Sequence, residues 1–435
     1  MFFLAFYIIN CYNNFNYGIL CEIVPKLKEY AMKRRIQFTA FFLAILTLFF
    51  ALCSCASTEI QTPDESTPDI NDGNQNTPEP APVVYLNPLT GLSCPENEVF
   101  LRPVAIMIDN EVNYKSGQYS NLGLSSADVL FETNIESNGS GTRMMAVFSQ
   151  NTLKNNDLEI GAVRSARPYF IQHAKMLDAY YVHEGSSSTD DVLPGSVTDP
   201  KYYARPMLYS DYIDGYELTF DGKISYRPKS DINNKLCVVS SAVITHAPDL
   251  LQYLTTNYPR TTYQTSEANR LFLFGDANLS AGKDASSVRI RFSDSNAFYT
   301  QSKFTYNTET GKYVRSQYLY QSSLRGVNEH DIASKDIKTG ENLTFTNVFV
   351  LSTKQYACDK SYDGQPYHTK IDLIGNEGKG YYFTEGKYVN ITWKCPSDSS
   401  PIRFYAENGS ELVVNPGKTF INLVSDNAFP DLKIA

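Results

Sequence analysis

The residues best suited to bind a ligand are arginines in the first half of the chain. Arg164 and Arg167 stand three positions apart, and Ser165 between them is a candidate N-cap for a helix beginning at Pro168. Arg143 can join them from a neighbouring predicted strand. Guanidinium groups bind carboxylate or phosphate bidentately, and backbone N–H groups at a helix N-terminus attract anions. The pattern predicts an anion pocket for a wall polymer, a peptide carboxylate or a phosphate.

Three carboxylates, Asp109, Glu132 and Glu136, form a second candidate group. Asp109 ends the most apolar predicted strand, and sites in α/β sheets gather beyond the carboxyl ends of strands. Asp109 with either glutamate could supply the acid and the base or nucleophile of a glycan hydrolase, at separations of about 5–5.5 Å or about 6.5–9.5 Å. Alternatively, these carboxylates neutralise the arginines in a structural network, and Asp109 belongs to a turn.

His183 is a third candidate, because it stands next to Glu184 and a Gly-Ser turn. It could act as a general base for Ser186 or Ser187, although the chain lacks the G-x-S-x-G elbow. The alternative is a polar turn before a helix. Neighbouring residues on a strand point to opposite faces, so His183 and Glu184 cannot together chelate one metal ion.

Metal and cofactor signals are missing from the sequence. The five histidines have no H-x-x-x-H spacing, and the sequence Pro416-Gly-Lys-Thr419 lacks the upstream glycine of a phosphate loop. Four cysteines of the folded part are too far apart for a C-x-x-C pair or a dense disulfide framework: Cys94, Cys237, Cys358 and Cys395. A bridge between Cys358 and Cys395 stays open. We therefore expect no metal and no cofactor.

The elements that must position these residues form two regions. From about Asn87 to about Pro259, buried strands alternate with helices, which predicts an α/β or α+β domain with a mixed sheet at 84–265. The predicted strands are Val104–Ile108, Asp128–Ile135, Arg143–Phe148, Gly161–Arg164 and Asp178–His183, and the predicted helices start at Pro168 and Pro248.

The second region, 266–428, is predicted to be β-rich. Residues Val288–Phe292 alternate strictly between apolar and polar, as in a half-buried strand, and Asn408-Gly409 is a strong hairpin signal. Further strands are expected at Asn347–Leu351, in hairpins around Asn307–Gly311 and Glu385-Gly386, and at Thr419–Val424. We expect a curled sheet or a small barrel.

Composition restricts the class of protein. Among 435 residues, 42% are hydrophobic and 20% are charged, which is typical of a globular chain of two to three domains. The balance of 38 basic against 47 acidic residues, a net charge of −9, argues against a nucleic-acid binder. The chain has 31 tyrosines, and aromatic side chains pack well on the faces of β-sheets, so this composition favours extensive sheet.

The N-terminal residues form an export signal. A basic cluster at Lys33–Arg35 precedes an apolar run of about 15 residues that ends before Cys55. Because Met32 directly precedes the cluster, we expect translation to start there and 1–31 to be a gene-call artefact; the alternative is a first hydrophobic segment at Met1–Asn10, which is too short to span a membrane. With Leu52 three positions before Cys55, the sequence resembles a bacterial lipobox. We therefore expect 1–54 to be the signal region and Cys55 to be diacylated; an uncleaved signal anchor is the alternative.

Residues 55–83 are expected to be a disordered, lipid-anchored linker. The segment is rich in proline and carries acidic residues without Lys or Arg, so it has little apolar surface to bury. As a coil it reaches roughly 30 Å. It would hold the folded part away from a membrane surface.

Several motifs in this order resemble the YerB-like bacterial lipoproteins, a family of unknown function with DUF3048 N- and C-terminal domains: Asn87-Pro-Leu-Thr-Gly91, Arg102-Pro-Val-Ala-Ile-Met-Ile-Asp-Asn110, Gly123-Leu-Ser-Ser-Ala-Asp128, Gly161-Ala-Val-Arg-Ser-Ala-Arg-Pro168 and Val414-Asn-Pro-Gly-Lys-Thr-Phe420. The resemblance covers about Pro88 to Val424. It implies a lipid-anchored envelope protein on the extracytoplasmic face of the cell membrane and no established reaction. The stretch Asn138-Gly-Ser-Gly141 departs from the family's more compact form.

Two functions follow as hypotheses. The first is a binding or accessory module that holds an anionic envelope ligand, such as a cell-wall polymer, or an envelope protein, with Arg143, Arg164, Ser165 and Arg167 as ligand-binding residues. The second is an enzyme that modifies wall glycan or peptide with paired carboxylates. The sequence leaves open whether the protein is an enzyme.

Overall fold

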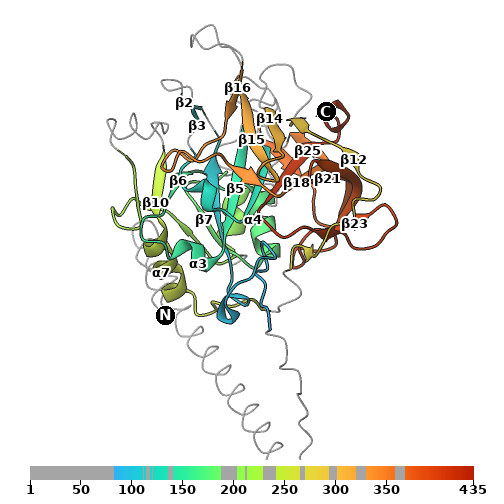
Figure 1. Ribbon diagram of the computed structural model, residues 1–435. Helices are drawn as coiled ribbons and strands as arrows, with labels where there is room; N and C mark the ends of the chain where they lie inside the picture. Colours follow the sequence, from blue (N-terminus) through green and yellow to red (C-terminus); the bar gives the residue numbers. More distant parts are fainter. Residues whose placement is uncertain are drawn as a thin grey trace, which may run out of the picture. The chain divides into compact units, whose positions relative to one another are not determined.

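The computed structural model (Figure 1) describes residues 83–110, 112–113, 118–119, 121–135, 141–187, 203–210, 213–228, 242–264, 270–292, 301–319, 330–357 and 368–435. The predicted signal region with Met32, the predicted lipidation site Cys55, the predicted linker up to residue 82, and Glu136, Cys237 and Cys358 lie outside these residues. In the described ranges, every helix is too short or too polar to span a membrane.

A 14-stranded mixed sheet is the main element of the fold. Its path runs β12-β22-β21-β18-β25-β4-β5-β1-β6-β10-β9, while β23 pairs with β22, β7 with β1, and β8 with β7. The strands of this sheet are β1 (Val104–Asp109), β4 (Val129–Asn134), β5 (Thr142–Phe148), β6 (Glu159–Val163), β7 (Tyr180–His183), β8 (Gly215–Glu217), β9 (Ser225–Tyr226), β10 (Val243–His246), β12 (Lys283–Asp284), β18 (Asn347–Thr353), β21 (Asn376–Thr384), β22 (Lys387–Cys395), β23 (Arg403–Ala406) and β25 (Thr419–Ser425).

The central strands are apolar because both of their faces are covered. Every residue of β1, β4, β5 and β25 is buried, as expected for strands with packed layers on each side. In β1, Ala105 and Met107 belong to one core, and Ile106 and Ile108 to the other. The continuous apolar run Val104–Ile108 is therefore explained by burial of β1 on both faces.

The two halves of the sequence meet inside this sheet. Strand β25 runs parallel to β4, with Thr419 opposite Val129 and Leu423 opposite Thr133, and also runs parallel to β18 on its other side. Residues Ala81–Ala435 form one compact unit. The domain boundary between 265 and 266 stays a prediction, but strands from both sides of it share one sheet.

A second, six-stranded sheet covers one face of the central sheet. It consists of β13 (Ser287–Arg291), β14 (Gln301–Asn307), β15 (Lys312–Leu319), β16 (His330–Ala333), β17 (Thr344–Phe345) and β26 (Lys433–Ile434). Its Ile290 and Phe304 pack in the same core as Ile106 and Ile108 of β1, together with the buried face of helix α7 (Ala247–Asn257).

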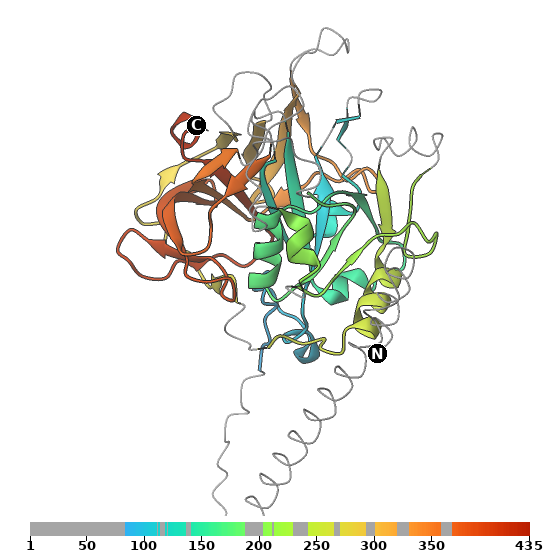
Figure 2. The same cartoon turned by 180° about the vertical axis from the view of Figure 1, so that it is seen from behind.

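Helix α4 (Pro168–Met176) covers the opposite face and lies in front in Figure 2. Pro168 occupies the first turn, where its missing N–H costs nothing, and Ile171 and Ala174 supply the buried side. The helix is followed by Asp178 with φ 51°. The other helices of the described residues are α3 (Gln150–Leu153), α5 (Ala204–Leu208), η1 (Glu96–Glu98), η2 (Leu124–Ser126) and η5 (Phe429–Asp431). The described residues also form three two-stranded sheets: β2 (Val112–Asn113) with β3 (Gln118–Tyr119), β11 (Leu273–Phe274) with β24 (Val413–Val414), and β19 (Gln355–Ala357) with β20 (Thr369–Ile371).

The predicted fold class is confirmed: an N-terminal part with a mixed sheet and helices, followed by a β-rich C-terminal part. The described strands of the C-terminal part do not form a small barrel of their own, because they divide between the central sheet and the second sheet. The curl of a sheet stays a prediction. The two described cysteines of the folded part, Cys94 and Cys395, are free thiols, and Cys358, the candidate partner of Cys395, lies outside the described residues.

Candidate functional site

Asp109 and Arg143 lie side by side at one end of the central sheet. Asp109 is the last residue of β1, and its register partner on the antiparallel strand β5 is Arg143. Both side chains share the sheet face of Met107 and Met145, because side chains alternate along a strand. The site therefore lies on the face that α4 covers.

The segment Arg164–Arg167 reaches this point because β1 changes its neighbour there. Strand β6 pairs with β1 at one position, Val163 opposite Ile108. Along Val104–Ile106, the same edge of β1 pairs with β7 instead. The intervening chain leaves the sheet. Backbone hydrogen bonds hold it in place: Arg164 N–H donates to the Met107 carbonyl (3.1 Å), Ala166 N–H to Gly185 (2.9 Å) and Glu184 N–H to Arg164 (3.1 Å).

Three guanidinium groups converge on the end of β1. Arg164 Nε lies 3.2 Å from Asp109 Oδ2, Arg143 Nη1 donates to the Ser165 carbonyl (3.0 Å), and Arg167 Nη1 donates to the Ala166 carbonyl (2.9 Å). Burial, followed by the positive charges of Arg167 and Arg164, lowers the pKa of Arg143 to about 10, and the negative charge of Asp109 opposes this shift. The predicted arginine group is thus assembled in space.

The arginine cluster (Arg143, Arg164 and Arg167) contains two buried guanidinium groups, those of Arg143 and Arg167, for which the described residues supply no ion-pair partner. Arg143 is 5% and Arg167 is 9% exposed, yet within the described residues neither forms an ion pair with a carboxylate. The Nε atoms of both are buried without a hydrogen-bond partner in that same part of the chain. Buried charges normally have partners, so the cluster is suited to an anion.

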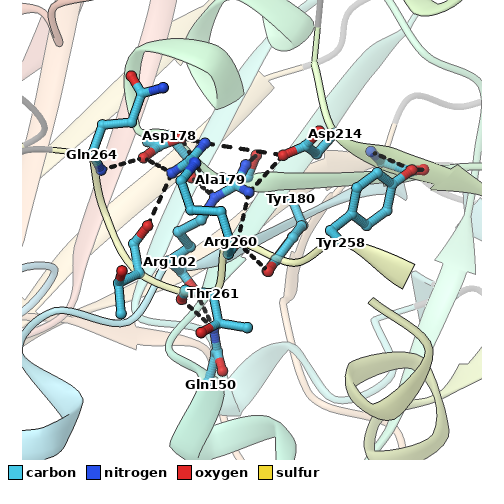
Figure 3. Close-up of polar contacts among 12 residues, drawn as sticks. Arg102, Gln150, Asp178, Ala179, Tyr180, Asp214, Tyr258, Arg260, Thr261 and Gln264 are labelled. Atoms are coloured by element: carbon cyan, nitrogen blue, oxygen red, sulfur yellow. Dashed lines mark hydrogen bonds and ion pairs between the residues drawn. The ribbon is translucent and has the colours of Figure 1, made fainter. Parts of the chain in front are cut away.

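A second arginine network shows what a balanced arrangement looks like in this fold (Figure 3). Arg102 Nη1 lies 2.6 Å from Asp214 Oδ2, and Arg260 Nη2 donates to Asp178 Oδ1 (2.6 Å). Arg102 Nε is also 3.4 Å from Asp178 Oδ1. Two arginines thus face two aspartates. This network anchors the end of α4, whereas Arg143 and Arg167 of the arginine cluster form no ion pair in the part of the chain that the structure describes.

Glu132 does not belong to the site. It shares its face of β4 with Leu130, which packs in the core beneath the second sheet, so it points away from Asp109. Its carboxylate accepts four hydrogen bonds: Oε1 from Asn110 Nδ2 (2.9 Å) and Thr142 Oγ1 (2.7 Å), and Oε2 from Ser302 Oγ (2.9 Å) and Arg315 Nη2 (2.8 Å).

Two interpretations of the sequence are corrected by this placement. Asp109 and Glu132 do not form the paired carboxylates of a glycan hydrolase, and Glu132 does not neutralise the arginine cluster. Glu136, the other candidate partner, lies outside the described residues. A sequence signal for the partner of Glu132 existed: Arg315 is in phase with the buried Tyr313 on an alternating strand, which places a charge on an inward face.

His183 lies at the end of β7 on the α4 face, beside Tyr181, with ring centroids 5.6 Å apart. Its Nδ1 is 2.8 Å from the Gly185 carbonyl, and burial lowers its pKa, so the neutral form is favoured. Ser187 Oγ accepts a hydrogen bond from Ala204 N–H (3.0 Å). These contacts orient the turn and give no His–Ser pair among the described residues.

Ser165 is not the helix cap that the sequence suggested. The N-cap of α4 is Arg167, and no side-chain hydrogen bond caps the helix. Ser165 instead contributes its carbonyl oxygen to Arg143. The described residues contain no group of three or more His, Cys, Asp or Glu that could hold a metal ion.

Comparisons with known proteins match the chain to one family. The model described as "Protein of unknown function (DUF3048) N-terminal domain" matches residues 89–198, and the corresponding C-terminal domain matches residues 288–421. All three residues of the arginine cluster lie in the first match. The Glu132–Arg315 ion pair joins the two matches.

The chain is also similar to a protein of Bacillus subtilis (strain 168) named "Putative lipoprotein YerB", with 27% identity over 343 residues, 78% of this chain and 86% of the relative. A crystal structure of the YerB protein from Bacillus subtilis matches with a TM-score of 0.57 and 25% identity, over 80% of this chain and 99% of that chain.

Proposed function

We propose, from the premise that this chain belongs to the DUF3048 (YerB-like) family, that it is a binding module that holds an anionic ligand at the arginine cluster. One observation carries the proposal: the guanidinium groups of Arg143 and Arg167 are buried near the end of β1, and neither forms an ion pair with a carboxylate of the described residues. A phosphate or carboxylate would supply the missing negative charge and would accept charge-assisted hydrogen bonds.

The positions of the arginines support binding of an anion in a defined geometry more than long-range electrostatic attraction of anions. The guanidinium groups of Arg143 and Arg167 are already directed by hydrogen bonds to backbone carbonyls, so little side-chain entropy is lost when an anion binds. Arg164 is the most accessible of the three, with 21% of its side chain exposed. An anion would enter on its side.

Anion binding is tested by titrating the purified protein with inorganic phosphate and with succinate at constant ionic strength. Each substitution, Arg164→Ala or Arg167→Ala, removes a charge-assisted hydrogen bond and should weaken binding about tenfold or more without unfolding the protein. Arg289→Ala is the matched control, because Arg289 pairs with Asp331 on the second sheet. Unchanged affinity in both cluster variants, or no binding of either anion, would refute the proposal.

We further propose that the module works at the outer face of a cell membrane, on a cell-wall polymer or an envelope protein, held by lipid on Cys55. The lipobox-like sequence before Cys55 and the name of the Bacillus subtilis relative support this location. Growth with a labelled fatty acid tests the anchor. Label should appear in the protein and disappear in Cys55→Ser; equal labelling of both forms would contradict the assignment.

A further inference from the structure

A pocket of about 380 Å³ lies between the first turns of α4 and the chain around β20. Pro168, Tyr169 and Gln172 of α4 form one wall. The other wall consists of residues 369–374, which belong to the C-terminal part of the sequence. Its volume is within the range of pockets that take small molecules, about 300–1,000 Å³.

This pocket adjoins the arginine cluster. Arg167 directly precedes Pro168 in the chain, and the Tyr169 side chain lies close enough to Arg143 and Tyr181 to affect the pKa of each. The Tyr169 hydroxyl donates to the carbonyl oxygen of Asn134 (3.3 Å). The peptide link from Arg167 to Pro168 joins the cluster to the pocket wall, so a ligand that reaches both would lie along the first turn of α4.

The pocket combines apolar and polar groups at close quarters. Its Leu373 is buried, and Thr369 accepts a hydrogen bond from Asn134 Nδ2 (3.3 Å). Lys370 Nζ lies 3.1 Å from Asp372 Oδ1, so a donor and an acceptor stand together on one side. Across from them, Gln172 Oε1 is a buried acceptor without a hydrogen-bond partner among the described residues.

We propose that the arginine cluster and this pocket form one site for an acidic sugar, with the carboxylate or phosphate at the arginine cluster and the hydroxyl-bearing ring in the pocket. The inference rests on the proposed function and names the ligand class for it. Ring hydroxyls both donate and accept hydrogen bonds, which matches Gln172 Oε1 on one wall and the Lys370–Asp372 pair on the other.

The shape of the pocket favours a sugar over an acidic peptide. A peptide strand would require a free strand edge or a long groove, whereas a volume of about 380 Å³ holds a compact group. An acidic peptide is therefore the outcome that the experiment must exclude.

Calorimetric titration of the purified protein with five probes tests this inference: glucose 6-phosphate, glucuronate, glucose, inorganic phosphate and the dipeptide alanyl-glutamate. We expect both acidic sugars to bind at least tenfold more tightly than inorganic phosphate, and glucose to bind most weakly. Gln172→Ala should reduce that preference to less than threefold and leave phosphate affinity unchanged. Gln252→Ala, an exposed position of α7, is the matched control and should change neither.

The results separate this inference from the proposed function. Binding of inorganic phosphate as tight as that of both acidic sugars, no effect of Gln172→Ala, or tighter binding of the dipeptide than of either sugar would overturn the acidic-sugar assignment alone. If no anionic probe binds, the proposed function fails as well.

Discussion

Glu132 illustrates how one buried charge can join two sheets. Its side chain and that of Arg315 are fully buried, and their ion pair links β4 of the central sheet to β15 of the second sheet. Arg315 also donates from Nη1 to Ser334 Oγ (2.7 Å). Removing two charges from water is costly, and here the cost is offset because hydrogen bonds satisfy both carboxylate oxygens.

We predict that Glu132→Gln destabilises the protein by about 3–5 kcal/mol, because Arg315 is left buried without a negative partner. Asp331→Asn, which breaks the half-exposed Arg289–Asp331 pair, should cost at most about 1 kcal/mol. Urea unfolding of both variants measures the difference. The double variant Glu132→Gln/Arg315→Met should recover most of the loss; equal losses in Glu132→Gln and Asp331→Asn would contradict this account.

At the scale of residues, the sequence predicted the arginine cluster better than the carboxylates. The ends of predicted strands placed Arg143 near Asp109, and the strand-to-helix transition placed Arg164 and Arg167 beside them. The pairing of Asp109 with Glu132 failed because side chains alternate between faces, and the relative phase of two strands depends on a register that no local pattern encodes. The pocket beside α4 could not be predicted either. Its second wall begins at Thr369, which is far from α4 in the sequence, and no local pattern shows that the two segments meet.

At the scale of elements, the segment around η2 depends on one glycine. Gly123 has φ +75°, and a Cβ at this position would lie 2.3 Å from the carbonyl oxygen of Glu159. Neither backbone can move easily, since Leu122 and Gly161 exchange two hydrogen bonds of 2.9 and 3.1 Å. Only glycine can adopt this positive φ without strain and also leave room for the Glu159 carbonyl.

We predict that Gly123→Ala costs about 1–3 kcal/mol more than Gly340→Ala. Gly340 has φ +77°, so it shares the backbone strain, but a Cβ there would meet nothing within 4 Å. The difference isolates the steric clash from the left-handed conformation, which costs about 1–2 kcal/mol by itself. Chemical denaturation of the two variants gives both values, and similar losses would show that the loop relaxes around the new methyl group.

Secondary structure was the most predictable level. The helix at Pro168, the hairpin at Asn307–Gly311 and the strand at Thr419–Val424 were expected from residue types and are present. Local patterns succeed there because turns, caps and burial on a face act over a few residues. They could not show that Thr419–Ser425 pairs with β4, since that contact depends on two surfaces far apart in sequence.

At the scale of the whole molecule, the shared sheet should make unfolding cooperative. The pairing of β25 with β4 and the Glu132–Arg315 ion pair connect the two parts that the sequence separates. Neither part can unfold without exposing strand edges and a buried charge in the other. We therefore expect one transition for the described fold.

The single tryptophan makes this prediction measurable. Trp393 is buried in β22, so its fluorescence reports on the C-terminal part, while far-UV circular dichroism reports on all strands and helices. The two signals should give the same urea midpoint in the purified protein. Two separated midpoints would show that the halves unfold independently and would favour a domain boundary near residue 265.

The position of β25 has a consequence for synthesis. The strand lies between β4 and β18 in the middle of the sheet, yet only η5 and β26 follow it in the sequence. The ribosome therefore synthesises the central strand of the sheet almost last. Until β25 is made, β4 and β18 each have one edge without a hydrogen-bonded neighbour. Chains that stop before Thr419 would keep those edges open, and open edges are the surfaces on which unfinished proteins aggregate.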